Sequence, residues 1–345
     1  MLRVTVIIPH AGGQELLREC LRSLSATCNV DLRTLIVHNG PVDDVDAETL
    51  ALVQHVQVLR YERNIGFSAA CNRGVEAAST DYVFLLNNDA TVKPDTIGLL
   101  AEKLASDASI AACQPKILSL TSPGKFDYSS AAGGEIDRYG YPFARGRVFD
   151  TIEEDKGQYD TEREIFWGAG AALMLRREHY LAAGGLEEPF FAHMEEIDLQ
   201  WRFRLMGYRV ISLPSAIAFH RGAVTIKIGS FRKIYLNHRN GLITLFRNYS
   251  LKNLLKNLPA RLGLDFILVI YSVIRADFVT ARAVLSAMIW FSLSLPYLIS
   301  SRRRVRKLAV VPDSKIQEHI FPYSVVWLYF VKKIKTWNEL KAFQV

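Results

Sequence analysis

Two stretches of the sequence carry polar side chains at a spacing that could support chemistry, and the first is FLLNNDATVKPD (84–95). An apolar run there ends in Asn87, Asn88 and Asp89. In an open α/β sheet, ligands bind at the carboxyl ends of the parallel strands. One carboxylate beside two amides suits a divalent cation that is held mainly by the phosphates of its ligand. This stretch therefore predicts a site for a phosphorylated ligand and a metal ion.

The second stretch is FFAHMEEIDLQWR (190–202), in which Glu195, Glu196 and Asp198 crowd the start of a predicted helix. Acids this close repel one another, which raises a pKa and suits one of them to act as a general base. The structural alternative is that they only complement the dipole at a helix N-terminus. His220 follows a strand in IAFHRG, and a lone histidine there is either a ligand or a structural residue.

Strands that alternate with helices are expected to position these residues. The pattern predicts strands at 4–9, 34–39, 56–61, 82–87, 109–115, 167–177 and 208–214, and helices at 14–24, 67–78, 94–106 and 195–206. Residues 119–165 are expected to form an irregular insertion, and basic, apolar helices are expected beyond His220. The predicted fold class is α/β, with a mostly parallel sheet flanked by helices and a C-terminal helical extension.

Composition is consistent with such a fold. Half of the 345 residues are hydrophobic and 22% are charged, which supports a substantial core and argues against disorder. The four cysteines (Cys20, Cys28, Cys71, Cys113) show no CxxC spacing, so free thiols in a reducing compartment are expected. The N-terminus enters a strand at once, which argues against a secretory signal.

Taken in order, the motifs resemble the family 2 glycosyltransferases, inverting enzymes of the Rossmann-like GT-A fold that use nucleotide-sugar donors. VTVIIP, ERNIGFSAACNRG (62–74) and LLNNDA (85–90) resemble the donor-binding half of that family, and WGAGAALMLRR, GGLEEPFFAHMEEIDLQWRFRLMGYRV and FHRG resemble its acceptor half. The resemblance is greatest to bacterial rhamnosyltransferases and related enzymes of surface polysaccharide synthesis. It implies a catalytic domain at 1–225, with a nucleotide-sugar half at 1–115 and an acceptor half at 116–225.

The resemblance also implies the roles of individual residues. Asp89 and His220 would hold Mg²⁺ or Mn²⁺ on the donor diphosphate. Glu196 would be the catalytic base, with Glu195 and Asp198 beside it in the acidic motif, where Asp198 would orient the acceptor or fix the helix start. The residues implied in binding the nucleotide sugar are Pro9, His38, Asn39, Asn64, Gly66, Asn72, Asn87 and Asn88.

Charge divides the chain into two parts. From His220 onward there are 21 Lys and Arg against 5 Asp and Glu, whereas the first 219 residues contain 21 against 30. This basic region, taken as residues 226–345, is expected to lie on an anionic membrane surface, with the protein peripheral on the cytoplasmic side of a bacterial inner membrane. The alternative is that its helices pack on the catalytic domain or on a second copy in a homodimer. No nucleic-acid-binding module accompanies the charge, so a nucleic-acid partner is not expected.

The predicted function is transfer of a sugar from a nucleoside-diphosphate sugar to a hydroxyl of a lipid-linked or polysaccharide acceptor. A nucleotidyltransferase is an alternative, although PHAGGQE after the first strand lacks the basic residue that such an enzyme would normally carry. A non-catalytic scaffold that binds nucleotide sugars is the other alternative.

Overall fold

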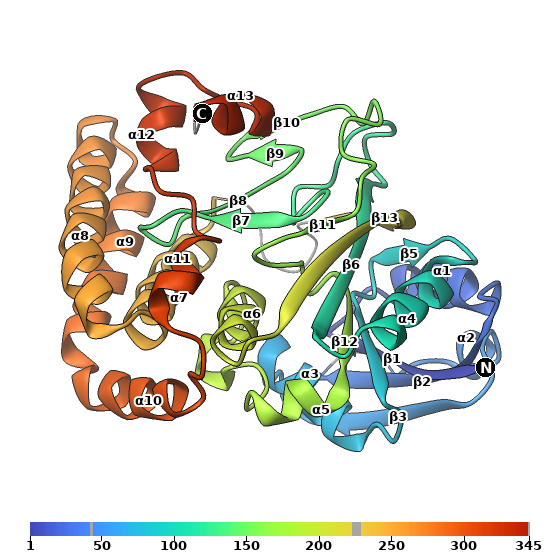
Figure 1. Ribbon diagram of the computed structural model, residues 1–345. Helices are drawn as coiled ribbons and strands as arrows, with labels where there is room; N and C mark the ends of the chain where they lie inside the picture. Colours follow the sequence, from blue (N-terminus) through green and yellow to red (C-terminus); the bar gives the residue numbers. More distant parts are fainter. Residues whose placement is uncertain (42–43, 223–228, 344–345) are drawn as a thin grey trace.

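The computed structural model describes residues 1–41, 44–222 and 229–343, and its centre is a nine-stranded sheet (Figure 1). The strand order is β11-β13-β6-β12-β4-β1-β2-β3, and β5 pairs with β13. The N-terminal half consists of β1 (Leu2–His10), α1 (Gln14–Ser25), β2 (Val30–Asn39), α2 (Ala47–Leu50), β3 (Val56–Tyr61), α3 (Phe67–Ala77) and β4 (Tyr82–Leu86). The predicted βα alternation is confirmed here.

The strands of this half are parallel, and their carboxyl ends lie at one edge. β1 pairs with both β2 and β4, and the register sets His10 opposite His38 at the end of the β1–β2 pair. Alternating side chains of β1 face opposite sides of the sheet, so Ile8 and Ile7 belong to two different core clusters. The sheet is therefore covered on both faces, as in other doubly wound α/β folds.

The next part of the sheet mixes strand directions. It contains β5 (Ala90–Val92), α4 (Thr96–Ser106), β6 (Ile110–Ser119), β12 (Ala172–Arg176), α5 (Arg177–Ala182), a 3₁₀ turn (Glu188–Phe190), α6 (Glu195–Leu205) and β13 (Arg209–His220). β12 lies antiparallel between β4 and β6, whereas β13 is parallel to β6. β13 continues past the predicted end at 214, through a register shift between Leu213 and Ile217, and ends at His220.

The insertion is more ordered than the sequence indicated. Its strands β7 (Gly134–Ile136), β8 (Pro142–Ala144), β9 (Arg147–Val148) and β10 (Thr151–Ile152) form a second, antiparallel sheet, and β11 (Arg163–Glu164) joins the main sheet. The expectation of an irregular segment was wrong because strands of two or three residues are too short to show an alternating pattern. This small sheet shares a third core cluster with the C-terminal helices, centred on Phe143, Phe321 and Trp337.

The C-terminal region is helical, as expected. Its helices are α7 (Phe231–Asn248), α8 (Leu251–Ile274), α9 (Phe278–Leu293), α10 (Leu295–Lys307), α11 (Asp313–Gln317), α12 (Val325–Phe330) and α13 (Trp337–Ala342). Helices α7 to α10 gather beside α6, on the side of the molecule away from β1 to β3 (Figure 1). The division expected between residues 225 and 226 lies outside the described residues.

The uncharged stretch at 283–301 is not one straight helix. It is divided between α9 and α10, which meet at a bend of 75°. α8 is long and apolar enough to cross a membrane, and the bent pair would count as a second span only if taken together. Within α8, Arg261 and Asp265 are buried, and Asp265 accepts hydrogen bonds from Arg261 at 3.0 Å and from the hydroxyl of Tyr141 at 2.9 Å. One side of α8 is therefore attached to the insertion.

Candidate active site

The ends of β4 and β13 bring Asp89 and His220 together. Nε2 of His220 lies 3.2 Å from Oδ1 of Asp89 and 3.2 Å from Nδ2 of Asn87. Backbone pairing fixes this arrangement, because His220 stands opposite Ala90 of β5 and the N–H of Arg221 donates to the carbonyl of Asp89 at 3.1 Å. The two residues implied as metal ligands are thus neighbours at the sheet edge, although 131 positions separate them in the sequence.

Asp127, from the insertion, lies on the other side of the His220 ring. Its Oδ1 is 3.0 Å from Nδ1 of His220 and accepts hydrogen bonds from the backbone N–H and the hydroxyl of Ser129. Burial lowers the pKa of His220, but hydrogen bonds to Asp127 and Asp89 outweigh it and raise that pKa to about 10. The sequence analysis missed Asp127, because its one local signal is an Asp two residues before a Ser, which is typical of any Asx turn.

These side chains fit a divalent cation that is shared with a ligand. Over residues 1–41, 44–222 and 229–343, no group of three or more His, Cys, Asp or Glu side chains is arranged to hold a metal ion by itself. Asp89 offers a carboxylate, and His220 would offer Nε2 after a bound cation displaces its proton. The remaining coordination positions would go to water and phosphate oxygens. Asp127 at Nδ1 of His220 corresponds to the carboxylate–histidine pairing that orients many metal-binding imidazoles.

Asn88 joins this edge to the end of β1. Its Nδ2 donates to the carbonyl of Gly12 at 2.8 Å and lies 3.0 Å from Nδ1 of His10. Burial, together with the charge of His38, lowers the pKa of His10 to about 4, so the ring is neutral and Nδ1 can accept from the amide. His10 is a second residue that the sequence analysis missed.

The implied nucleotide-binding residues at the end of β2 form one hydrogen-bonded group. Oδ1 of Asn39 accepts from the N–H of Ile65 at 2.8 Å, and its Nδ2 donates to Oδ1 of Asn64 and to the carbonyl of Gly66, both at 3.3 Å. These amides therefore shape the loop before α3. Pro9 and His38 lie beside this group at the ends of β1 and β2, and the ring of His38 is centred 6.1 Å from that of His10.

Gly66 lies where the two halves of the site meet. Its φ is +89°, and a Cβ atom there would come within 2.7 Å of the Phe191 ring and 2.9 Å of the Phe191 carbonyl oxygen. That same carbonyl accepts from the N–H of Phe67 at 2.7 Å. Only glycine allows this approach between the start of α3 and the segment that leads into α6.

The polar atoms of Asn72 are taken up by hydrogen bonds within the protein. Its Oδ1 accepts from the hydroxyl of Tyr180 at 2.6 Å and the N–H of Leu186 at 2.9 Å, and its Nδ2 donates to the carbonyl of Leu186 at 2.9 Å. The side chain is 7% exposed. Its contacts hold the Gly-Gly-Leu-Glu-Glu loop against α3, so a direct contact with the donor finds no support here.

Glu195 and Glu196 begin α6 and differ in their surroundings. Glu195 is buried, and burial together with the charge of Glu196 raises its pKa well above the usual range. Glu196 is partly exposed, and burial of its carboxyl group raises its pKa to about 7. One buried oxygen of each side chain has no hydrogen-bond partner among the described residues. Of the two, Glu196 is the one that can exchange a proton near neutral pH.

Asp198 has a structural environment. It is fully buried, and Oδ2 accepts from Nε and Nη2 of Arg202 at 3.0 and 2.9 Å, while Oδ1 accepts from Nδ2 of Asn248 at 2.8 Å. Arg247 adds an ion pair at 3.4 Å. These contacts leave no carboxylate oxygen facing an acceptor, and they support the second of its two expected roles, which is to fix the start of the helix.

Similarity to known proteins agrees with these motifs. Residues 5–159 match the model of glycosyl transferase family 2. The chain is 24% identical over 259 residues to the N-acetylglucosaminyl-diphospho-decaprenol L-rhamnosyltransferase of Mycobacterium tuberculosis, covering 71% of this chain and 84% of the relative. It is 26% identical over 237 residues to the pre-mycofactocin glycosyltransferase of the same organism, covering 67% of this chain and 45% of the relative.

Among solved structures, S. aureus TarS 1-349 superposes with a TM-score of 0.49 at 13% identity, with 92% of each chain covered. The family match includes β1 to β4 and the Asn-Asn-Asp motif, and the alignment with the rhamnosyltransferase covers most of both chains. The chain is a glycosyltransferase, and its residues 5–159 are similar to glycosyl transferase family 2.

Proposed function

We propose that the protein is an inverting, metal-assisted transferase that moves a sugar from a nucleoside-diphosphate donor to an acceptor hydroxyl. The observation that carries the proposal is Glu196, a partly exposed residue whose buried carboxyl group has a pKa of about 7. The segment before it is hydrogen-bonded to the loop that begins α3, through the Phe191 carbonyl and the N–H of Phe67. A base is thereby held next to the loop that the family resemblance assigns to the donor.

Asp89 and Nε2 of His220 would hold the divalent cation, Mg²⁺ or Mn²⁺. When bound, that cation would stabilise the negative charge on the leaving diphosphate as a Lewis acid. Asp127 accepts from Nδ1 of His220 and would keep Nε2 directed toward Asp89. We assign Asp127 as a positioning residue, because its carboxylate acts through the imidazole. Asn87, whose Nδ2 lies 3.2 Å from Nε2 of His220, would line the same edge of the proposed metal site.

Glu196 would take the proton from the acceptor hydroxyl as its oxygen forms a bond to the anomeric carbon. The bond from that carbon to the donor phosphate breaks at the same time, and the nucleoside diphosphate leaves on the opposite face. A single base and an in-line displacement give inversion at the anomeric carbon, whereas a retaining mechanism would use a carboxylate as nucleophile. Glu195, which is buried and whose pKa is raised well above its usual range, is not assigned this role.

The proposed acceptor is lipid-linked or a growing polysaccharide of a bacterial cell surface. The name of the M. tuberculosis rhamnosyltransferase describes a diphospho-decaprenol acceptor. In this chain, large apolar side chains are exposed along α8 and at the start of α9, among them Ile267, Tyr271, Ile274 and Phe278. We propose that this face lies against the cytoplasmic surface of the membrane, where a lipid-linked acceptor would be presented.

A thermal-shift panel tests the donor class. UDP-, GDP- and dTDP-linked sugars are added with and without Mn²⁺, since a ligand that binds only the folded state raises Tm. We expect at least one nucleotide sugar to raise Tm, and to do so more in the presence of Mn²⁺. If none raises Tm, or if Mn²⁺ makes no difference, the metal-assisted donor site is wrong.

Product analysis separates the alternatives. With water as acceptor, a sugar transferase releases the nucleoside diphosphate and free sugar. Release of pyrophosphate from nucleoside triphosphates would favour a nucleotidyltransferase. Donor binding without any turnover, in the presence of polyprenyl-diphosphate acceptors, would favour a non-catalytic scaffold.

A further inference from the structure

A helix outside the motif-bearing part of the chain holds the segment that leads into α6. We propose that Asn240 of α7, assisted by Arg239, is a positioning residue for the base Glu196, so that α7 forms part of the acceptor half of the site. This inference rests on the proposed function of Glu196. It extends the catalytic unit beyond the boundary expected at residue 225.

The segment before α6 has an unfavourable backbone conformation. Phe191, His193 and Met194 have φ angles of 66°, 70° and 70°. Residues with a side chain rarely adopt this left-handed region, and such residues persist only when surrounding contacts determine the conformation. Three of them within four positions, directly before Glu195 and Glu196, require an external support.

Asn240 provides that support. Its Nδ2 donates to the carbonyls of His193 at 2.7 Å, Ala192 at 3.0 Å and Phe190 at 3.1 Å, and the residue is fully buried. An amide nitrogen has two hydrogens, so the three carbonyls share them. Because these carbonyls converge on one donor group, Asn240 contacts the chain at three positions between 190 and 193.

Arg239 strengthens the same contact. Its Nη2 donates to the carbonyls of Pro189 at 2.7 Å and Phe190 at 3.1 Å. Its Nε donates to Oδ1 of Asn240 at 2.9 Å, which orients the amide so that Nδ2 faces the carbonyls. Both residues are thus used to hold one short segment.

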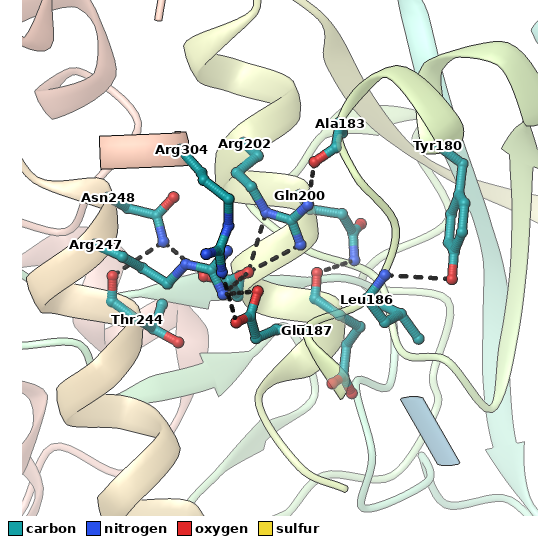
Figure 2. Close-up of polar contacts among 12 residues, drawn as sticks. Tyr180, Ala183, Leu186, Glu187, Gln200, Arg202, Thr244, Arg247, Asn248 and Arg304 are labelled. Carbon is teal, nitrogen blue, oxygen red and sulfur yellow. Dashed lines mark hydrogen bonds and ion pairs between the residues drawn. The ribbon is translucent and has the colours of Figure 1, made fainter. Parts of the chain in front are cut away.

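A second attachment lies eight residues further along α7. Asn248 donates to Asp198 in the first turn of α6, and Nη1 of Arg247 lies 3.4 Å from Asp198 and 2.7 Å from Glu187. Figure 2 shows Glu187 facing the guanidinium groups of both Arg247 and Arg304, with which it forms ion pairs. Helix α7 therefore binds the chain on both sides of Glu195 and Glu196, before the helix and within it.

The segment 190–193, which Asn240 holds, also contacts the loop at the start of α3 that the proposed function assigns to the donor. The Phe191 carbonyl accepts from the N–H groups of Phe67 and Ser68 at 2.7 and 3.3 Å, beside Gly66. A shift of residues 190–194 would therefore change the distance between Glu196 and the donor loop. Since a misplacement of about 1 Å can lower a rate by about 100-fold, a support of this kind affects turnover without any contact to substrate.

The test uses Asn240→Ala in the full-length protein, with Thr244→Val as a matched control. Thr244 lies one turn further along α7, is buried, and its hydroxyl has no hydrogen-bond partner among the described residues. Hydrogen–deuterium exchange of the peptide covering 187–199 and steady-state hydrolysis of UDP-, GDP- and dTDP-linked sugars are measured for both variants. Arg239→Gln is a milder second variant in case Asn240→Ala does not fold.

We expect Asn240→Ala to increase exchange in 190–196 by about 10-fold or more, and to lower kcat by about 10- to 100-fold with donor KM changed less than about twofold. Thr244→Val should change neither. Unchanged exchange in 190–196, or a kcat no lower than that of Thr244→Val, would overturn the assignment. A parallel rise in donor KM would instead mean that Asn240 supports donor binding, and would overturn it too.

The proposed function can fail separately. If the wild type hydrolyses none of the donors, or if Glu196→Gln keeps its turnover, the base assignment fails. The exchange measurement still decides whether Asn240 holds the segment before α6. If both Asn240→Ala and Arg239→Gln retain wild-type exchange, α7 is not a support for that segment.

Discussion

The metal-side edge of the sheet and the base-bearing helix α6 are supported in different ways. At the edge, Asn88 bonds to the loop after β1 and Asp89 meets His220 at the end of β13, so most supports are themselves strand ends. At α6, the supports come from Asn240 and Asn248 of α7. Strand ends of one sheet meet by topology, whereas a helix is fixed by whichever element packs on it. Changes at the edge should therefore affect donor binding, and changes around α6 should affect turnover.

The largest effect on donor binding is expected from Asp89→Ala. The variant should fold, since Asp89 lies at a strand end, but its Mn²⁺-dependent donor binding should fall by more than about 100-fold. Even outer partners of metal ligands typically contribute about 10- to 100-fold in affinity. Asn87 and Asn88 cannot replace a formal charge. Donor titration with and without Mn²⁺ measures the effect, with the exposed Asp95→Ala as control. If Asp89→Ala keeps the turnover of the wild type in the presence of metal, the assignment of Asp89 as a metal ligand is wrong.

In helix α6, Glu196→Gln should abolish sugar transfer and leave the donor affinity unchanged. A general base contributes about 10²- to 10⁴-fold in rate, and glutamine cannot accept the proton. Glu195→Gln should cost less, because Glu195 is buried whereas Glu196 is partly exposed. Donor KM and kcat of both variants give the comparison. Near-normal turnover of Glu196→Gln would assign the base to a neighbouring residue.

The pH dependence of kcat/KM gives an independent test of the proposed base in α6. A base is active when deprotonated, and burial raises the pKa of Glu196 to about 7. The kcat/KM of the wild type should therefore fall below about pH 7 and level off above it. The acidic limb should be missing from the residual activity of Glu196→Gln. An acidic limb near pH 4 in the wild type would mean that the base is a carboxylate in an ordinary environment.

At the metal-side edge of the sheet, Asp127→Asn should have a smaller effect than Asp89→Ala. Asparagine keeps the size of the side chain but removes the charge that faces Nδ1 of His220. We expect Mn²⁺ affinity, measured by titration in the presence of the nucleoside diphosphate, to weaken by about 10- to 100-fold. Donor binding without metal should stay the same, as it should in the control Asp95→Asn. Unchanged Mn²⁺ affinity would mean that Asp127 only supports the fold.

The sequence predicted the edge better than its supports. Asn87, Asn88 and Asp89 were visible because an apolar strand ends in polar residues, and His220 because it follows a strand. Asp127 was not visible, because the insertion carries no periodic pattern and the partner of its carboxylate is 93 residues away. The same limit applies to Asn240, since an Asn on a helix shows nothing in sequence about the carbonyls that it will meet.

The structure changes two expectations, one about Asp198 in the acceptor half and one about the basic C-terminal region. Asp198 stood in an acidic motif, but its carboxylate lies inside a network with Arg202, Arg247 and Asn248. Part of the basic cluster in the second half of α10 is also structural. Arg302 donates to the carbonyls of Phe246 and Tyr249, and Arg306 donates to that of Asn248, so both help to end α7. Sequence composition does not separate such arginines from those that face solvent.

The smallest effect on donor hydrolysis is expected from the membrane-facing arginines, and their choice follows from that separation. Exposed arginines near the apolar face of α8 and α9 are Arg275 and Arg282, and Arg303 is exposed on α10. Each basic residue near an anionic surface contributes about 1 kcal/mol to binding. Reversal of all three to Glu should therefore move the protein from vesicles that contain phosphatidylglycerol into the soluble fraction, and raised salt should do the same more weakly. Cosedimentation measures the change, with Lys341→Glu on α13 as control and neutral vesicles as reference. Donor hydrolysis should be unaffected, because none of the three contacts the strand-end edge or α6 in the hydrogen bonds and ion pairs described above.

The alternative is that the apolar face is an interface between two copies of the chain. In that case the wild type would bind no anionic vesicles, and it would sediment as a dimer that dissociates when Ile267 and Ile270 are changed to Glu. That result would withdraw the membrane proposal.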